Sequence, residues 1–192
     1  MRLNFRLVAA IAPVLILLCT IATRPLQGQG RVLPAQILVQ RAVRVADAQD
    51  KTVFIHFGAS WCKWCKQLNA MLRSPELKQI IGNYFVVINL TVQESESKKL
   101  AENPGAEKLM TETGGKTGVP YYLFLDKDGA KIANSMVLPD HANIGYPATT
   151  EEIKSFGDLM GRVAPRMSVD ERARIVDYLI KHAPKDEDAA TH

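Results

Sequence analysis

Apolar residues recur along the chain with two different spacings, which predict helices and strands in turn. Residues 34–50 carry apolar side chains at a helical spacing, whereas residues 52–58 are a short β-branched and aromatic run that ends at a glycine. The first range is predicted to be a helix and the second a buried strand. A further helix begins close to Cys62, a short helix is capped by Ser74, and a second strand covers residues 84–90.

The second half of the chain predicts helical segments, a hairpin and two C-terminal helices. Residues 93–113 are charged and helix-prone, with a break at residues 103–105. After a glycine-rich loop come a strand at 121–125, a tight turn at 126–129, a strand at 130–137, and two helices that open with the capping-box pairs Thr149 with Glu152 and Ser168 with Glu171. Because helical segments separate the strands, we expect parallel pairing and an α/β fold.

The N-terminal residues have the pattern of an export signal. Two arginines and no acid precede an apolar run of 15 residues, and small residues follow it. A membrane span needs about 20 apolar residues, and Pro13 interrupts the run. We therefore predict a signal peptide and spacer over residues 1–30, with the cleavage site left open and lipid attachment at Cys19 as a minor alternative.

Composition is that of a globular protein with one cysteine pair to explain. The 192 residues are 47% hydrophobic and 23% charged, which suits one domain with an ordinary core. The formal net charge of +4 is spread without a run of Lys or Arg, so nothing in it favours nucleic-acid binding. Once a signal is removed, only Cys62 and Cys65 remain, and a loop this short gives a disulfide little to stabilise.

The cysteine pair lies where a predicted strand meets a predicted helix. Unpaired N–H groups and the positive end of the helix dipole lower the pKa of a thiol at a helix start, and Lys63 and Lys66 add positive charge. Cys62 is therefore expected to be the exposed nucleophile. Cys65 lies almost one turn later, within reach to attack a mixed disulfide and release the substrate.

Two other readings of the pair stay open, a metal site and a pair of inert core thiols. Zinc normally takes four ligands, and the histidines are not at a ligand spacing: His56, His141, His182 and His192. The run "GGKTG" at 114–118 lacks the full phosphate-binding pattern and no helix follows it, so we interpret it as a backbone loop that leads to Pro120.

The segment "FIHFGASWCKWCKQL" at 54–68 resembles the active-site segment of thioredoxin-fold proteins, in which a strand leads to Trp-Cys-x-x-Cys at a helix start. "TGVP" at 117–120 stands just before a strand, as the family's cis-proline does. "YYLFLDKDGAKIA" resembles the family's closing hairpin, and "IGYPATTEEI" resembles the glycine and C-terminal helix after it. The resemblance covers about residues 34–165 and is nearest to an exported subgroup with a WCxWCK site.

The resemblance implies a thioredoxin fold, with a central mixed sheet of about four strands flanked by helices. It places a thioredoxin-like domain at residues 31–165 and a C-terminal helix and polar tail at 166–192. It also implies the following roles: Cys62 attacks, Cys65 resolves, Trp61 shields the site, and Pro120 borders the substrate groove. Val119, Gly145 and Tyr146 are expected to line that groove. Trp64 is expected there too because it lies between the cysteines, with a core anchor as the alternative.

Two residues depart from the family pattern. The family's buried acid, six residues before the first cysteine, is His56 here, and Lys63 and Trp64 replace the Gly-Pro of thioredoxin. His56 is either a histidine satisfied within the strand or a proton acceptor for Cys65 in place of the carboxylate.

By resemblance, we expect a thiol–disulfide oxidoreductase of the cell envelope, periplasmic or otherwise extracytoplasmic, acting as a reductase or isomerase. Its expected partners are cysteine-containing exported proteins and a membrane redox partner, with a membrane tether if residues 1–30 stay uncleaved. We expect no cofactor, no resident metal and no nucleic acid. The competing hypothesis is a non-catalytic thioredoxin-fold binding module or a Cu(I) carrier that uses the two thiolates.

Overall fold

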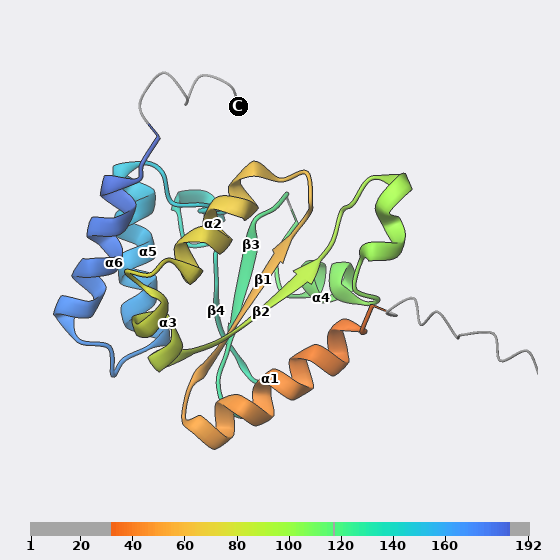
Figure 1. Ribbon diagram of the computed structural model, residues 1–192, viewed down its shortest axis with the longest axis horizontal. Coiled ribbons are helices and arrows are strands. Elements are labelled where there is room, and N and C mark those ends of the chain that lie inside the picture. Colours follow the sequence, from red (N-terminus) through yellow and green to blue (C-terminus); the bar gives the residue numbers. More distant parts are fainter. Residues whose placement is uncertain (1–31, 117, 185–192) are drawn as a thin grey trace, which may run out of the picture. The chain divides into compact units, whose positions relative to one another are not determined.

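The computed structural model describes residues 32–116 and 118–184, in which helices and strands follow one another largely as predicted (Figure 1). The helices are α1 (Ala35–Gln49), α2 (Lys63–Arg73), α3 (Lys78–Tyr84), α4 (Ala106–Glu112), α5 (Thr150–Val163) and α6 (Val169–Lys181), with 3-10 turns η1 (Glu96–Ala101) and η2 (Pro139–His141). The strands are β1 (Thr52–Gly58), β2 (Phe85–Thr91), β3 (Tyr121–Leu125) and β4 (Lys131–Asn134).

The four strands form one mixed sheet in the order β2-β1-β3-β4. β1 pairs in parallel with β2, and β3 runs antiparallel to both β1 and β4. Parallel pairing is therefore confirmed for β1 with β2, where helices α2 and α3 make the crossover. It is wrong for β3, because the chain passes from β2 to the other side of β1 and returns in the opposite direction. The mixed sheet agrees with the implied thioredoxin fold.

Each face of the sheet is covered by helices and has its own apolar core. Phe54, Tyr122 and Phe124 pack on one face with residues of α2, α3, α5 and α6. Val53, Ile55 and Phe57 point to the other face, among residues of α1 and α4. Because both faces are buried, β1 and β3 are nearly continuous apolar runs instead of alternating ones.

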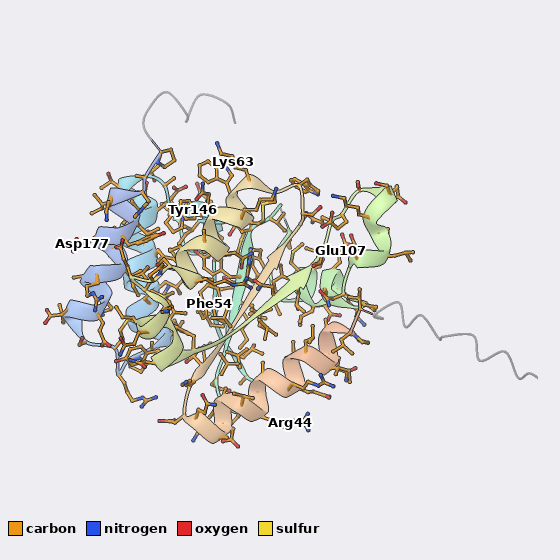
Figure 2. All side chains as sticks on the ribbon, viewed as in Figure 1. Arg44, Phe54, Lys63, Glu107, Tyr146 and Asp177 are labelled. Atoms are coloured by element: carbon orange, nitrogen blue, oxygen red, sulfur yellow. A yellow bond between two sulfur atoms is a disulfide. The ribbon has the colours of Figure 1, made fainter. Side chains whose placement is uncertain are left out.

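Phe54 belongs to the first core and is labelled in Figure 2. Its ring centroid is 4.6 Å from that of Phe124, 5.4 Å from that of Tyr122 and 5.9 Å from that of Phe85. Tilted and edge-on pairs of this kind add about 0.5–1.5 kcal/mol each beyond the area they bury. The aromatic cluster therefore fixes β1, the strand that leads to the cysteines.

The short helix after Ser74 and the strand predicted over 130–137 begin or end at different residues from those predicted. Residues 75–77 form a turn before α3 starts at Lys78, although Ser74 still caps the segment, since its Oγ accepts from the Leu77 amide at 3.2 Å. The strand predicted over 130–137 ends at Asn134. The next residue, Ser135, is fully buried and its Oγ accepts a hydrogen bond from the Tyr122 amide at 3.1 Å.

The C-terminal helices confirm both predicted capping boxes. The side chains of Thr149 and Ser168 each accept from the backbone amide three residues on, and Glu152 and Glu171 return the bond. Caps of this kind are worth about 0.5–2 kcal/mol. Helix α6 packs on the same apolar core as α5, and Gly157 lies where the two helices meet, since a Cβ at that position would be 2.9 Å from Cγ2 of Val176.

The predicted signal peptide and spacer over residues 1–30 lie outside the described residues, as does the polar tail after Pro184. In the described part of the chain, no helix is both long enough and apolar enough to cross a membrane. The domain boundary at residue 165 stays a prediction.

Candidate active site

Strand β1 delivers the cysteine pair to the start of α2. Cys62 is the N-cap residue of the helix, and its Sγ accepts a hydrogen bond from the Cys65 amide at 3.0 Å. The two cysteines form a disulfide, with 5.3 Å between their Cα atoms. The predicted position of the pair at a strand-to-helix junction is confirmed, and the helix dipole acts on Cys62 as expected.

Cys62 is more buried than the sequence predicts. We expected an exposed nucleophile, yet Cys62 and Cys65 are each only 3% exposed in this disulfide form. The reason is local packing, because Ala59, Trp64 and Val119 close around the two sulfurs. A thiol-reactive partner must therefore meet Cys62 through this apolar rim.

The loop before β3 brings Val119 and Pro120 to the cysteines. The Val119–Pro120 peptide bond is cis, and the carbonyl oxygen of Val119 lies 3.5 Å from Cys62 Sγ. Asn143 fixes this loop from the opposite side, since its Nδ2 donates to the Pro120 carbonyl at 2.9 Å and its Oδ1 accepts from the Gly145 amide at 3.3 Å.

A groove of about 450 Å³ lies beside this loop. The predicted groove residues Trp64, Val119, Gly145 and Tyr146 all line it, together with Pro120. The ring of Trp64 stacks on that of Tyr146, and the Lys63 ammonium lies 5.4 Å from the Trp64 ring centroid. Figure 2 shows Lys63 and Tyr146 at the same end of α2. The structure therefore brings together residues that are about 80 positions apart in the sequence.

His56 lies beneath the cysteines with only one side of its ring hydrogen-bonded. The residue is 1% exposed, and its Nδ1 lies 3.0 Å from Oδ1 of Asn89 and 3.3 Å from Oδ1 of Asn69. Because both partners present acceptor oxygens, Nδ1 carries the proton and donates, which leaves Nε2 as the ring's acceptor. Burial lowers the pKa of His56 below 6.5, and the two asparagine contacts only partly oppose this.

The acceptor nitrogen of His56 points toward Cys65. Nε2 is buried and has no hydrogen-bond partner among the described residues. A Cβ placed on Gly58 would be 3.1 Å from His56 Nε2 and 3.2 Å from Cys65 Sγ, so the two atoms approach the same point. His56 and Cys65 also line one cavity of about 250 Å³. The absence of a side chain at Gly58 keeps this space open.

Trp61, predicted to shield the site, is exposed, whereas Trp64 is half-buried. Trp61 is 58% exposed, and its Nε1 donates to the carbonyl of Gln93 at 2.7 Å. The apolar contacts of the cysteines come from Ala59, Trp64 and Val119, so the shielding role of Trp61 stays a prediction. Across residues 32–116 and 118–184, no cluster of three or more His, Cys, Asp or Glu side chains is arranged to hold a metal ion.

Comparison with known families identifies the fold family of this site. The sequence profile of the thioredoxin-like domain matches residues 39–140, more than half of the chain. The chain belongs to the thioredoxin-like domain family. The matched range holds the cysteine pair, His56 and Pro120, while Gly145 and Tyr146 lie just beyond it.

This thioredoxin-like chain also resembles individual proteins. It is 29% identical over 112 residues to the thiol:disulfide interchange protein TxlA homolog of Synechocystis sp., covering 57% of this chain and 54% of that protein. It is 30% identical over 145 residues to the thiol:disulfide interchange protein DsbD of Photorhabdus laumondii, covering 68% of this chain and 24% of that protein. The chain thus spans about half of the first relative's length and a quarter of the second's.

Solved structures include a similar chain. The crystal structure of a disulphide isomerase from Xylella fastidiosa Temecula1 matches with a TM-score of 0.46 and 21% identity, covering 77% of this chain and 89% of that one.

Several polar residues of this thioredoxin-like site escaped the sequence analysis. Asn69 and Asn89 bind His56, and Asn143 fixes the loop of Pro120. Asn69 alone had a local signal, because it follows Cys65 by four positions and so lies on the same helix face. Asn89 is brought to the site by the pairing of β2 with β1, and Asn143 by the loop between β4 and α5.

Proposed function

We propose that this chain is a thiol–disulfide oxidoreductase of the cell envelope that exchanges the Cys62–Cys65 pair with disulfides of substrate proteins, in the reducing or isomerising direction. One observation carries the proposal. The disulfide lies at the N-terminus of α2, beside the Val119–Pro120 loop and above the acceptor nitrogen of His56. The names of the two relatives, both thiol:disulfide interchange proteins, support the same chemistry.

The exchange begins from the dithiol form. The Cys62 thiolate attacks one sulfur of a substrate disulfide, forms a mixed disulfide and displaces the other substrate sulfur as a thiolate. The Cys65 thiolate then attacks Cys62 Sγ, which forms the Cys62–Cys65 disulfide and releases the second substrate thiolate. Two electrons pass from the cysteine pair to the substrate. A dithiol donor must return them, and we propose that a membrane redox partner does so.

His56 serves the second step in this proposal. Cys65 must lose its thiol proton before it can attack, and the neutral Nε2 of His56 faces Cys65 Sγ across the site of the missing Gly58 side chain. Asn69 and Asn89 hold the ring in the tautomer that leaves Nε2 free to accept. His56 thereby takes the part of a general base.

The groove beside Pro120 receives the substrate polypeptide. Trp64, Val119, Gly145 and Tyr146 give it one largely apolar wall next to Cys62, and Lys63 adds a positive charge at its edge. An extended, cysteine-containing segment of a partly unfolded protein fits such a surface. Export through residues 1–30 would bring the chain to proteins that form disulfides outside the cytoplasm.

Trapping tests this proposal directly. In the full chain, Cys65→Ser should accumulate mixed disulfides between Cys62 and exported proteins, and Cys62→Ser with Cys65→Ser should accumulate none. The proposal would be contradicted if Cys65→Ser formed no adducts while the unaltered pair bound one Cu(I) per chain. That outcome would favour the carrier hypothesis. A redox titration of the unaltered pair against glutathione then separates a reductase from an oxidase.

A further inference from the structure

A nearly buried carboxylate holds the loop that precedes Cys62. Glu94 is 7% exposed, and both of its oxygens bind Ser60. The Ser60 amide donates to Oε1 at 2.5 Å, and the Ser60 hydroxyl donates to Oε2 at 2.8 Å. Since Ser60 lies two residues before Cys62, this pair of bonds fixes the approach of the chain to the disulfide.

Neighbouring contacts extend this attachment on both sides of Ser60. The Val92 amide donates to the Gly58 carbonyl at 2.9 Å, and Trp61 Nε1 donates to the Gln93 carbonyl at 2.7 Å. Gln93 has a φ of 55°, in the left-handed region that non-glycine residues seldom adopt. Figure 1 shows the segment after β2 beside the loop from β1 to α2.

The side chains of Glu102 and Asn103 hold the segment that carries Glu94. The Glu94 amide donates to Oε1 of Glu102 at 2.7 Å, and the Lys99 ammonium binds the same oxygen at 3.1 Å. The Thr91 amide donates to Oδ1 of Asn103 at 2.7 Å. Contacts to the backbone of Thr91 and Glu94 therefore hold this segment in place.

Glu94 also brings a negative charge to the cavity that His56 and Cys65 line. The hydrogen bonds from the hydroxyl and amide of Ser60, helped by the charge of Lys98, hold the pKa of Glu94 below its usual range, so it is ionised at neutral pH. The other charged or titratable groups nearby are Lys66, which lines the cavity, and Lys98, whose Nζ lies 3.1 Å from Ser60 Oγ.

A fixed negative charge acts differently on the two redox forms of the pair. The disulfide carries no charge, whereas the dithiol form carries one when a thiol ionises, and a nearby carboxylate raises the free energy of that thiolate. The effect is larger in a partly buried site than in water, because the effective dielectric constant is lower. Glu94 thus opposes the helix dipole and Lys66, both of which favour the thiolate.

We propose that Glu94 is a positioning residue of the exchange reaction: it holds the loop before Cys62 through Ser60, and its charge favours the disulfide over the thiolate form, which biases the pair toward reducing its substrates. This inference rests on the proposed function. In this proposal, the charge of Glu94, which lies outside the CxxC motif, sets the direction of electron flow.

The test compares substitutions in the full chain. Glu94→Gln removes the charge and keeps the size of the side chain, whereas Ser60→Ala keeps the charge and removes the hydroxyl that binds Glu94 and Lys98. Glu102→Gln is the matched control, because it alters the same segment one step away from the cavity. For each variant, the equilibrium with glutathione and the rate of Cys62 alkylation against pH are measured.

We expect Glu94→Gln to shift the glutathione equilibrium toward the dithiol by about tenfold, equivalent to about 30 mV for this two-electron couple. The midpoint of its alkylation profile should move to lower pH. Ser60→Ala should slow the exchange with little shift in equilibrium, and Glu102→Gln should shift neither quantity. Should Glu94→Gln fold poorly, Glu94→Asp and Glu94→Asn give the same comparison with a shorter side chain, and only the asparagine variant should shift the equilibrium.

Two outcomes overturn the inference. One is an active Glu94→Gln protein with an unchanged equilibrium, and the other is an equal shift in Glu102→Gln, which would reveal general loosening of the segment. Neither outcome affects trapping by Cys65→Ser, so the inference can fail while the proposed oxidoreductase function stands.

Discussion

The ring of Trp64 stacks on the ring of Tyr146, with 5.6 Å between their centroids and 16° between their planes. Trp64 lies between the two cysteines, and Tyr146 lies in the loop before α5, so the stack joins the helix of the nucleophile to the far wall of the groove. Tyr146 is 6% exposed and belongs to the core, which makes it the fixed partner of the pair.

Trp64→Ala should weaken binding of polypeptide substrates more than it weakens the chemistry. Loss of the stack and of the apolar wall should raise the KM for a peptide disulfide severalfold, because stacked aromatic pairs contribute about 0.5–1.5 kcal/mol. The rate with dithiothreitol, which is too small to fill the groove, should change little. Trp64→Phe, which keeps a ring, is the control. Equal losses with the peptide and with dithiothreitol would contradict the assignment of Trp64 to the groove.

His56→Gln should slow the resolving step without abolishing it. Loss of a general base lowers a rate by about 10²-fold or more. Because the pKa of His56 is lowered by burial, Nε2 of the unaltered protein stays neutral below pH 6.5 and loses its acceptor role only as pH falls through that lowered pKa. Stopped-flow release of substrate from the mixed disulfide, measured from pH 5 to 9, should show this acid limb.

The acid limb should disappear in His56→Gln and persist in His182→Gln, which removes an exposed histidine at the end of α6. A pH–rate profile that is identical in the His56 variant and the unaltered protein would show that Cys65 loses its proton by another route.

Burial of neutral His56 should also make folding stability depend on pH. The folded pKa is below that of the unfolded chain, so the unfolded state binds more protons as pH falls below about 6.5. The free energy of unfolding should therefore be highest above that pH and decrease as pH falls toward the folded pKa. Urea titrations at pH 5 and pH 8 measure the difference, which should be smaller in His56→Gln. An unchanged difference would mean that other groups cause it.

Gly58→Ala should disturb both the fold and the exchange reaction. The added Cβ would lie 3.1 Å from His56 Nε2 and 3.2 Å from Cys65 Sγ, so one of them must move. Overpacking of this kind destabilises a protein by about 1–3 kcal/mol. The matched control is Gly82→Ala in α3, where no atom lies within 4 Å of the added Cβ, and there we expect stabilisation by about 0.5–1 kcal/mol. Urea unfolding of both variants checks the prediction, and equal effects would contradict it.

Ser168→Ala should loosen α6 and leave the cysteines untouched. The variant loses the hydrogen bond from the Glu171 amide to Ser168 Oγ, at a loss of about 0.5–2 kcal/mol. Each kcal/mol lowers the melting temperature of a chain of this size by about 2–4 °C. Ser97→Ala, at an exposed residue of η1, should change it by less. A large fall in exchange rate in Ser168→Ala would show instead that α6 supports the active site.

The parts of this protein that could be predicted from sequence are those with local causes. The position of Cys62 at a helix start follows from the strand before it and the helical spacing after it, and the capping boxes at Thr149 and Ser168 follow from two residues three positions apart. Each depends on interactions within a few residues, so the chain displays them without its tertiary structure.

The remaining parts depend on contacts between distant segments. The antiparallel direction of β3 depends on which side of β1 it joins, which no local pattern states. The part of the burial of Cys62 that comes from Val119 depends on a residue 57 positions away, and Glu94 reaches Ser60 from 34 positions away. Asn89 is a polar residue within the apolar strand β2, and only its register opposite His56 shows what it binds.

Gly157 gives a criterion for recognising this architecture in other sequences. A Cβ at this position would lie 2.9 Å from Cγ2 of Val176, so a side chain there would force Val176 to shift. The CxxC motif alone cannot distinguish chains that carry the additional helix from chains that end earlier. The signature that this chain suggests is a glycine eight positions after a threonine cap, followed by a second capping box. Sequences with that signature are where the C-terminal helix can be expected to accompany the redox site.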